Sequence, residues 1–244
     1  MSAPLVLVDH VARRYGAVEA LADVSFRIDA PGITGILGPN GAGKTSLLDL
    51  LAGLARPSGG SLALFGDRLD EKPYPRRRVG VVLQREFVPD RVTVGEYAEL
   101  FAAIYGVADG ARTILRQAEL LERGQLAVER LSGGEAQRLF VAAAVVHAPE
   151  LLLLDEPSSG LDPAAKRALG DFLRQLAQKT CVLLATHDLN EAERICDRCL
   201  FIVGGRLRAE GATGELLASA AAASLEDAFF HYCGARVNLV GDAT

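Results

Sequence analysis

The stretch GPNGAGKT, residues 38–45, has the glycine spacing and the final lysine and hydroxyl of a phosphate-binding loop. It follows the apolar run 33–37 and precedes leucines at helical spacing, which is the strand, loop and helix context that such a loop requires. Glycines let backbone N–H groups turn towards phosphate oxygens, and the start of the following helix adds a positive dipole. We therefore predict a nucleoside triphosphate site that comprises Gly38, Pro39, Asn40, Gly41, Ala42, Gly43, Lys44, Thr45 and Ser46.

Two residues of this loop, and one beyond it, carry groups suited to the nucleotide and its metal. The ammonium of Lys44 is expected to reach the β- and γ-phosphates, and the Thr45 hydroxyl to ligate Mg²⁺. Asp155 ends the apolar run of LLLLDE, and the carboxyl ends of parallel strands meet at one edge of a sheet. A carboxylate there can hold Mg²⁺ through its water shell, so Thr45 and Asp155 are predicted metal ligands.

Three further polar residues follow apolar runs and are predicted to act near the γ-phosphate. Glu156 lies one residue beyond Asp155 and can point to the side from which water attacks in line, so we predict it as the general base. His187 follows CVLLAT and can donate to the γ-phosphate or position the water. Gln84 ends VGVVLQ, where a neutral amide can contact both the Mg²⁺ shell and the water. We therefore place Gln84 in both the catalytic and the metal sets.

The stretch LSGGEAQR, residues 131–138, contains no nucleophile and no metal ligand, yet precedes a long apolar run. Ser132 and Glu135 have the S-x-x-E spacing of a capping box. A cap does not require Gly133 and Gly134, because glycine weakens the first turn by up to about 1 kcal/mol and its merit is close backbone approach. We therefore predict a second anion site at residues 132–135.

The number of these groups predicts a pair of chains. The sequence has two phosphate-binding helix starts, but one set of metal ligand, base and histidine. The economical arrangement is a head-to-tail pair in which Ser132, Gly133 and Gly134 of each chain complete the site of the other.

Apolar runs predict the elements that position these residues. Residues 24–29 alternate apolar and polar, and residues 199–211 have the pattern of two strands that turn at Gly204 and Gly205, so both are expected in a half-exposed antiparallel layer. Four other runs have the non-alternating pattern of strands buried on both faces, and helical patterns separate them, so we expect a parallel α/β sheet. These runs are 33–37, 79–83, 151–155 and 181–186.

Between residues 92 and 148 the strand pattern gives way to helical spacing, which begins at the capping-box pair Thr93 and Glu96. The predicted fold class is therefore α/β: a P-loop NTPase core with a mainly parallel sheet, an antiparallel β layer and an α-helical subdomain inserted at about 87–148. From residue 213 we predict a short helical extension with a frayed end. Residues 1–212 then form the nucleotide-binding domain, and 213–244 the C-terminal extension.

The composition argues against several other classes of protein. A chain of 244 residues with 50% hydrophobic and 23% charged residues can bury a core without disulfides, so its four cysteines are expected as reduced thiols. The C-x-x-C at 196–199, with His231 and Cys233, leaves zinc binding as an alternative. We expect neither a membrane span nor a secretion signal, and therefore a cytoplasmic protein. A net charge of −5 and one short basic run, at 76–78, argue against nucleic acid as a partner.

The order of these motifs resembles that of the nucleotide-binding subunits of ATP-binding cassette (ABC) transporters, over about residues 5–211. GPNGAGKT resembles the Walker A loop, LLLLDEP the Walker B strand, and LSGGE the family signature, which other P-loop classes lack. Gln84 resembles the Q-loop glutamine, SSGLD at 158–162 the D-loop, and His187 the switch histidine. The chain departs from the family at Ala143, where arginine is frequent, and at Ser158, where threonine is usual.

This resemblance implies ATP and Mg²⁺ as cofactors and ATP hydrolysis coupled to transport as the activity. It implies that Tyr15 stacks on adenine with Val18 beside it, and that Asp162 reaches across a homodimer or heterodimer of ATPase subunits. From the sequence alone, Tyr15 can equally be an aromatic residue of an edge strand. The resemblance also implies a separate membrane-spanning permease subunit, which would hold this chain at the cytoplasmic face of the cell membrane. Phe87, Val88 and Pro89 offer a surface for that contact.

The direction of transport and the class of activity leave alternatives. EYAELFAAIYGV and SLEDAFFHYCG resemble segments of bacterial export-type cassettes, which favours an exporter. A soluble cassette ATPase that acts as a conformational clamp, for example in iron–sulfur assembly or repair, is the alternative, although the sequence lacks the coiled-coil insertion, tandem cassette or basic surface usual in such relatives. A small-molecule kinase is a third reading, against which LSGGE, the D-loop and Glu156 argue.

Overall fold

Two β-sheets form the centre of the structure, a computed structural model that describes residues 3–84 and 88–234. The larger sheet has six strands in the order β10-β9-β3-β8-β7-β6. Neighbouring strands pair in parallel, except that β10 is antiparallel to β9. The strands are β3 (Gly32–Leu37), β6 (Val79–Val82), β7 (Leu151–Asp155), β8 (Cys181–Thr186), β9 (Arg198–Val203) and β10 (Arg206–Ala212). The parallel α/β sheet and its four predicted strands are confirmed.

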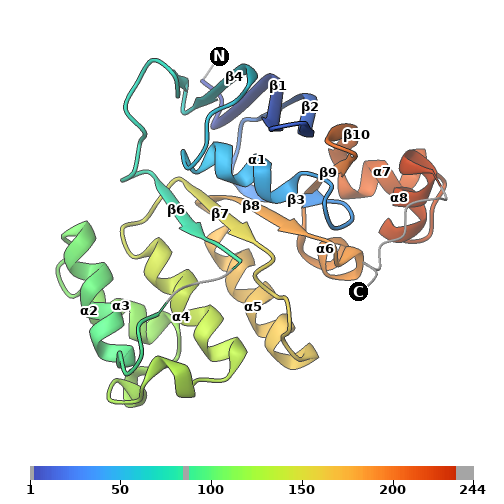
Figure 1. Ribbon diagram of the computed structural model, residues 1–244. Coiled ribbons are helices and arrows are strands. Elements are labelled where there is room, and N and C mark those ends of the chain that lie inside the picture. The colour runs from blue at the N-terminus through green and yellow to red at the C-terminus, as the bar shows by residue number, and fades with distance from the viewer. Residues whose placement is uncertain (1–2, 85–87, 235–244) are drawn as a thin grey trace.

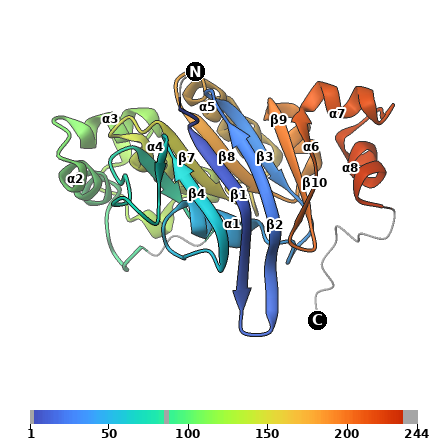
Figure 2. The same cartoon turned by 90° about the horizontal axis from the view of Figure 1, so that it is seen from above.

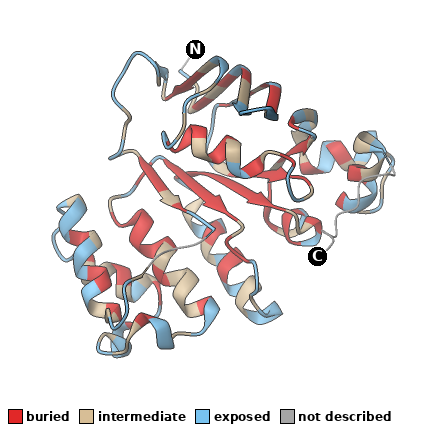
Figure 3. Cartoon of the chain, in the orientation of Figure 1, coloured by how far each residue is buried: buried red, intermediate tan, exposed pale blue. Residues whose placement is uncertain are grey.

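Burial explains why those four strands could be predicted. Every residue of β7 and β8 is buried, as expected for strands covered by other elements on both faces. Figure 3 shows the central strands of the larger sheet, β3, β7 and β8, as the buried centre of the molecule, with more exposed helices around them. An alternating sequence would leave polar side chains inside this centre, whereas LLLLD and CVLLAT place only their last residues at the edge where the site forms.

The smaller sheet is antiparallel, in the order β2-β1-β4-β5. It lies over one face of the larger sheet and is separated from it by a helix. It contains β1 (Val6–Tyr15), β2 (Val18–Ile28), β4 (Gly59–Leu64) and β5 (Asp67–Arg68). Helix α1 (Lys44–Leu51) lies between the two sheets in Figure 1 and buries four leucines there. One core cluster joins these leucines to both sheets, so burial of apolar surface fixes the position of α1. The N-terminus of α1, which follows the glycine-rich loop, is thereby fixed as well.

One prediction about the antiparallel layer is wrong. Residues 24–29 do belong to it, as part of β2, but residues 199–211 form β9 and β10 of the larger sheet. The predicted turn at Gly204 and Gly205 is present between them. The physical reason is that CLFI is apolar on both faces, so β9 is buried alongside β3, whereas β10 at the edge alternates between exposed and half-buried positions.

The helical segment is centred on α2 (Val94–Tyr105), α3 (Gly110–Gln117) and α4 (Gly133–Val145), with short 3₁₀ turns at Leu121–Arg123 and Val128–Arg130. Both predicted capping boxes are present, Thr93 with Glu96 and Ser132 with Glu135. Helix α4 has two apolar faces: Leu139 packs within the helical cluster, and Val141 packs on the larger sheet. Ala143 is fully buried among apolar side chains of the helices. The arginine that is frequent in the family at this position would place an unpaired charge there, which is costly.

The remaining helices cover the other face and one end of the larger sheet. Helices α5 (Pro163–Leu176) and α6 (Leu189–Ile195) pack on it, and α7 (Thr213–Ser219) and α8 (Leu225–Cys233) lie beside β9 and β10, as Figure 2 shows. In the described ranges no helix is long and apolar enough to cross a lipid bilayer. Of the C-x-x-C pair, Cys196 caps the end of α6 and Cys199 lies in β9; both are buried, and the described side chains form no cluster of three or more metal ligands.

The C-terminal helix α8 shares the core of the larger sheet. The ring of Phe229 is fully buried and meets the ring of Phe201 edge-on, with 5.3 Å between the centroids. Phe229→Ala is therefore expected to lower the free energy of unfolding by about 3 to 5 kcal/mol, as urea denaturation followed by circular dichroism would measure. The neighbouring Phe230 is only half-buried, so Phe230→Ala should cost distinctly less. Equal losses would show that α8 is not part of this core.

Candidate nucleotide-binding site

The glycine-rich loop connects β3 to α1, as predicted, and backbone from two other strands lies against it. A Cβ on Gly38 would lie 2.1 Å from the carbonyl oxygen of Ile202 in β9. Gly43 has a φ of 106°, and a Cβ there would lie 2.5 Å from the carbonyl oxygen of Ala20 in β2. Both positions therefore require glycine. Gly43 is also the N-cap of α1 and supplies no side-chain acceptor, which leaves the first N–H groups of the helix available to an anion.

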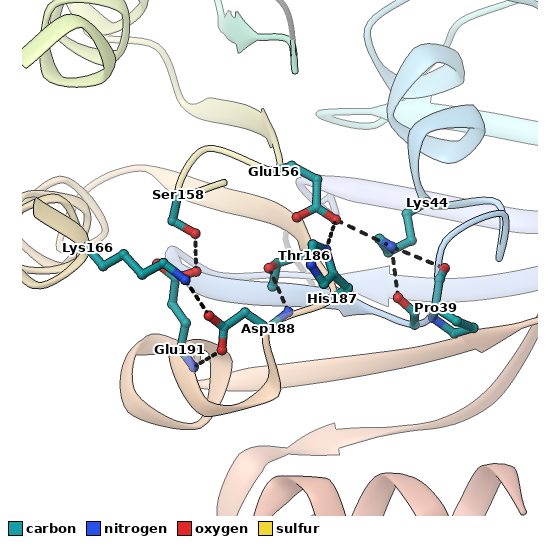
Figure 4. Close-up of polar contacts among 10 residues, drawn as sticks. Pro39, Lys44, Glu156, Ser158, Lys166, Thr186, His187, Asp188 and Glu191 are labelled. Carbon is teal, nitrogen blue, oxygen red and sulfur yellow. Dashed lines mark hydrogen bonds and ion pairs between the residues drawn. The ribbon is translucent and has the colours of Figure 1, made fainter. Parts of the chain in front are cut away.

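The buried ammonium of Lys44 lies inside the loop. Its Nζ donates to the carbonyl oxygens of Gly38 at 2.8 Å and Pro39 at 3.3 Å, and lies 3.5 Å from Oε1 of Glu156 (Figure 4). Burial lowers the pKa of Lys44, and the negative charge of Glu156 opposes that shift. Of the other loop residues, Ala42 is buried, Asn40, Gly41 and Thr45 line the loop and the helix start, and Ser46 lies in the first turn of α1.

The register of the larger sheet brings the other predicted residues to this loop. Leu37 of β3 pairs with Thr186 of β8, and Asp155 of β7 pairs with Ala185 of β8, so three strands end at one edge. His187 follows β8 directly, and its Nδ1 lies 2.9 Å from Oε1 of Glu156. The structure therefore brings Lys44, Asp155, Glu156 and His187 together, as the sequence predicts.

Glu156 adopts a backbone conformation that is rare for its residue type. Its φ is 49°, in the left-handed region, where a residue with a Cβ costs about 1 to 3 kcal/mol. Its N–H donates to the carbonyl oxygen of Ala185 at 2.9 Å, and its own carbonyl oxygen accepts from the N–H of Ser159 at 3.1 Å. These bonds turn the chain sharply after β7, so that the carboxylate lies between Lys44 and His187. Such strain clusters at functional sites.

Asp155 has the properties of a cation ligand. It is 2% exposed, burial raises its pKa, and a hydrogen bond from Thr45 opposes that shift. Its Oδ1 is buried and has no hydrogen-bond partner in the described part of the chain. A buried carboxylate oxygen without a partner is costly, and a hard divalent cation would satisfy it. Thr45 and Asp155 therefore fit the predicted Mg²⁺ ligands, and Gln84, exposed two residues beyond β6, lies at the end of the next strand.

Tyr15 and Val18 lie opposite each other at the end of the β1–β2 hairpin. Tyr15 is 45% exposed, and the guanidinium of Arg13 lies 4.4 Å from the centre of its ring. The same hairpin touches the loop through Ala20, two residues beyond Val18 along β2 and hence about 7 Å from it. Both side chains are exposed at the end of the hairpin that touches the phosphate loop.

The residues of LSGGE are not joined to this site within the chain. Glu135 accepts from the backbone N–H of Ser132, which lowers the pKa of Glu135, and from Arg123 at 2.8 Å. Across the described ranges, none of the hydrogen bonds or ion pairs of residues 132–135 reaches the loop 38–45. A Cβ on Gly134 would lie 2.7 Å from Cβ of Ala165 on α5. Gly134 therefore also allows α4 to pack closely on α5, a role that could not be predicted from the sequence.

Asp162 is also separate from the loop, as the N-cap of α5. Its Oδ1 accepts from the N–H groups of Ala164 at 2.9 Å and Ala165 at 3.0 Å, and its side chain is exposed. The residues predicted to reach across a dimer, Asp162 and Ser132, therefore lie at two exposed helix starts that pack together within one chain.

A polar network that the sequence patterns did not predict lies behind Glu156 and His187. Ser158 donates to Glu191, and Lys166 donates to Asp188 at 2.7 Å (Figure 4). Asp188 is the N-cap of α6 and accepts from the N–H of Glu191 at 3.0 Å, so the D-x-x-E spacing after His187 was the available signal. Burial of Glu191 could not be inferred from that spacing.

Comparisons with known proteins identify the family of this chain. The model of the ABC transporter family matches residues 21–159. Nod factor export ATP-binding protein I of Burkholderia orbicola is 40% identical over 86% of this chain and 71% of its own length. Its counterpart in Cupriavidus pinatubonensis is 39% identical, again over 86% of this chain, and the match spans 66% of that protein.

Two solved structures have the same fold over most of this chain. An ATP binding subunit of an ABC transporter superposes with a TM-score of 0.82 and 30% identity, covering 94% of this chain and 99% of its own. The protein cbiO1 from Clostridium perfringens, part of the ABC transporter complex cbiONQ, superposes with a TM-score of 0.77 and 25% identity, covering 88% and 91%. The chain therefore belongs to the ABC transporter family, as an ATP-binding subunit of the kind that hydrolyses ATP.

Proposed function

We propose that this chain binds ATP with Mg²⁺, pairs head-to-tail with a second ATPase subunit, and powers a separate membrane-spanning subunit that exports its substrate. The observation that carries the proposal is the meeting of Lys44, Asp155, Glu156 and His187 at one edge of the larger sheet, beside a loop that requires glycine. A phosphate loop, a cation ligand and a base in contact form the set that phosphoryl transfer to water needs.

The loop would bind the phosphates through the backbone N–H groups of residues 38–46 and the ammonium of Lys44. Thr45, Asp155 and Gln84 would hold Mg²⁺, which when bound neutralises charge on the β- and γ-phosphates. The unpartnered Oδ1 of Asp155 supports this assignment. Tyr15 would stack on the adenine with Val18 beside it, because both are exposed at the end of the hairpin that touches the loop.

Glu156 would act as the general base. As water attacks the γ-phosphorus, its proton passes to the Glu156 carboxylate, and the bond from phosphorus to the bridging oxygen breaks so that ADP leaves. His187 already lies 2.9 Å from that carboxylate and would orient it or donate to the γ-phosphate. The contacts to Lys44 and His187 explain how a carboxylate can be kept beside bound phosphate.

Ser132, Gly133, Gly134, Glu135 and Asp162 would serve the nucleotide of the second subunit. Ser132, Gly133 and Asp162 are exposed, and their own hydrogen bonds within the described chain are to helix starts and not to the loop. The start of α4, where Ser132 and Gly133 are exposed, would offer backbone N–H groups to an anion brought by another molecule. ATP bound between two such subunits would favour the closed pair by its greater affinity for it.

We propose one nucleotide-binding domain, residues 1–212, which carries the site and the inserted helices, followed by a short helical extension and tail at 213–244. Helices α2 to α4 lie within the range predicted for the subdomain. The predicted contact surface for the permease includes Phe87, which lies outside the described residues. Of the two described members of that surface, Val88 packs partly against the helical cluster and Pro89 is exposed.

The names of the relatives support the proposed membrane partner and location. The cbiO1 protein is named as part of a transporter complex, and the curated relatives are named for export of Nod factor. These names support a permease partner, a place at the cytoplasmic face of the membrane, and outward transport. They give no support to a soluble clamp, and we propose no particular substrate.

The test is a tagged pull-down from detergent-solubilised membranes of the native host, followed by mass spectrometry. We expect a multi-spanning protein in stoichiometric amount, absent from a parallel purification with the tag alone. Recovery of soluble partners only, from the same membranes, would contradict the transporter proposal and favour the clamp.

A further inference from the structure

We propose that Glu191 is a positioning residue of the ATPase site, which acts by holding Ser158 and thereby the segment that carries Glu156. The proposal rests on the proposed role of Glu156 as general base, and it adds a residue that is remote from the phosphate loop. It is carried by the contacts that connect Glu156 and His187 a second time, behind the site (Figure 4).

The contact between Ser158 and Glu191 is buried. The Ser158 hydroxyl donates to Oε2 of Glu191, and the two residues are 2% and 5% exposed. Burial raises the pKa of Glu191, and the hydrogen bond from Ser158 opposes that shift. Loss of the hydroxyl would leave a buried carboxylate oxygen without this donor, so the pair holds the chain at Ser158 to one position.

This contact closes a ring with the reacting groups. Glu156 meets His187 at 2.9 Å, and His187 is followed by Asp188, whose Oδ1 accepts from the N–H of Glu191 at 3.0 Å. Glu191 accepts from Ser158, which lies two residues after Glu156. The ring therefore fixes Glu156 relative to His187 both directly and through α6.

A second contact holds the far end of the same segment. Lys166 donates to Asp188 at 2.7 Å, and its backbone N–H donates to the carbonyl oxygen of Asp162 at 2.9 Å. Residues 158–162 are thus tied at both ends to the start of α6. Glu156, just before them, has a left-handed φ, and such a conformation persists only where the surroundings over-determine it.

Glu191 is not needed to attach α6 to the sheet. Leu189, Ala192 and Ile195 are buried against the larger sheet and already provide that packing. A buried carboxylate is costly and contributes orientation more than stability. The Glu191 carboxylate instead orients Ser158, and through Ser158 the segment that carries Glu156.

The experiment compares substitutions that remove or keep the hydrogen bond in the full chain. Ser158→Ala and Glu191→Ala remove it, whereas Ser158→Thr and Glu191→Gln keep a donor and an acceptor. We expect kcat for ATP hydrolysis to fall about 10- to 100-fold in the first two, with KM for Mg-ATP within about threefold, because small misplacement of a reacting group slows chemistry more than binding. The conservative pair should stay within about threefold of the wild type in kcat.

Coupling is tested by the double variant Ser158→Ala with Glu191→Ala, which should be no slower than the slower single variant, since both remove one contact. Thr213→Val is the matched control: Thr213 donates to the carbonyl oxygen of Cys196 at 2.7 Å, at the other end of α6, so the variant loses a buried hydrogen bond outside the ring. It should lower Tm to a similar extent and leave kcat unchanged. If Glu191→Ala does not fold, Ser158→Ala decides alone.

Two results would overturn the inference while Glu156→Gln remains inactive: wild-type kcat in Ser158→Ala, or a loss of kcat that Thr213→Val shares. Wild-type hydrolysis by Glu156→Gln would instead overturn the proposed base, and this inference with it.

Discussion

Glu156→Gln is expected to slow ATP hydrolysis by about 10²- to 10⁴-fold and to leave ATP binding intact. The amide has the size of the carboxylate and can still meet Lys44 and His187, but it cannot take a proton from water. ATP should therefore persist between two subunits and hold them together. Phosphate release measures the rate, and size-exclusion chromatography in saturating Mg-ATP should show a dimer.

Asp171→Asn is the matched control for this substitution. Asp171 is an exposed carboxylate on α5 that pairs with Arg174, so the same chemical change there should alter neither hydrolysis nor the elution volume. A Glu156→Gln variant that stays monomeric in saturating Mg-ATP would refute the nucleotide sandwich. One that hydrolyses ATP at the wild-type rate would refute the base.

Ser132→Arg is expected to reduce hydrolysis by about 10²-fold or more, while the monomer still binds ATP. Arginine at the start of α4 would fill the space that we assign to the partner's nucleotide, and residues 132–135 have no hydrogen bond to the loop of their own chain in the described ranges. Phosphate release measures the first effect. Equilibrium binding of a fluorescent ATP analogue, at protein concentrations that keep the chain monomeric, measures the second.

Loss of the cap must be separated from loss of the shared site. Thr93→Arg makes the same change at the N-cap of α2, in the same kind of capping box. It should lower the free energy of unfolding by about 0.5 to 2 kcal/mol, the contribution of an N-cap, and should not slow hydrolysis. If Ser132→Arg weakens ATP binding to the monomer, Ser132 belongs to the site of its own chain.

A mixture of the two variants tests the head-to-tail arrangement directly. When Glu156→Gln and Ser132→Arg subunits are mixed before ATP is added, each mixed pair contains one site with an intact Glu156 and an intact Ser132. About a quarter of the wild-type activity should return, because half of the pairs are mixed and half of their sites are intact. An inactive mixture would show that both residues act within one chain.

Features of this protein that depend on residues close together along the chain could be predicted from their order. Glycine spacing in the loop 38–45, two capping boxes, and the apolar runs of β3, β7 and β8 each carry their structural meaning in a few consecutive residues. The carboxyl ends of parallel strands lie at one edge of a sheet. The sequence could therefore predict the proximity of four residues that follow such strands: Lys44, Asp155, Glu156 and His187. Because local geometry and strand order fix this cluster, its members could be predicted from the sequence to lie together.

Tertiary structure alone decided which residues surround that cluster. The place of β9 beside β3 depends on what covers its two faces, and the need for glycine at Gly134 depends on the approach of α5. Glu191 has the D-x-x-E spacing of an ordinary helix start, yet it is buried against Ser158, 33 positions earlier in the chain. Spacing encodes the contacts of one helix or strand, whereas burial and long-range pairing depend on how whole elements pack, because apolar area is removed from water only when distant segments meet.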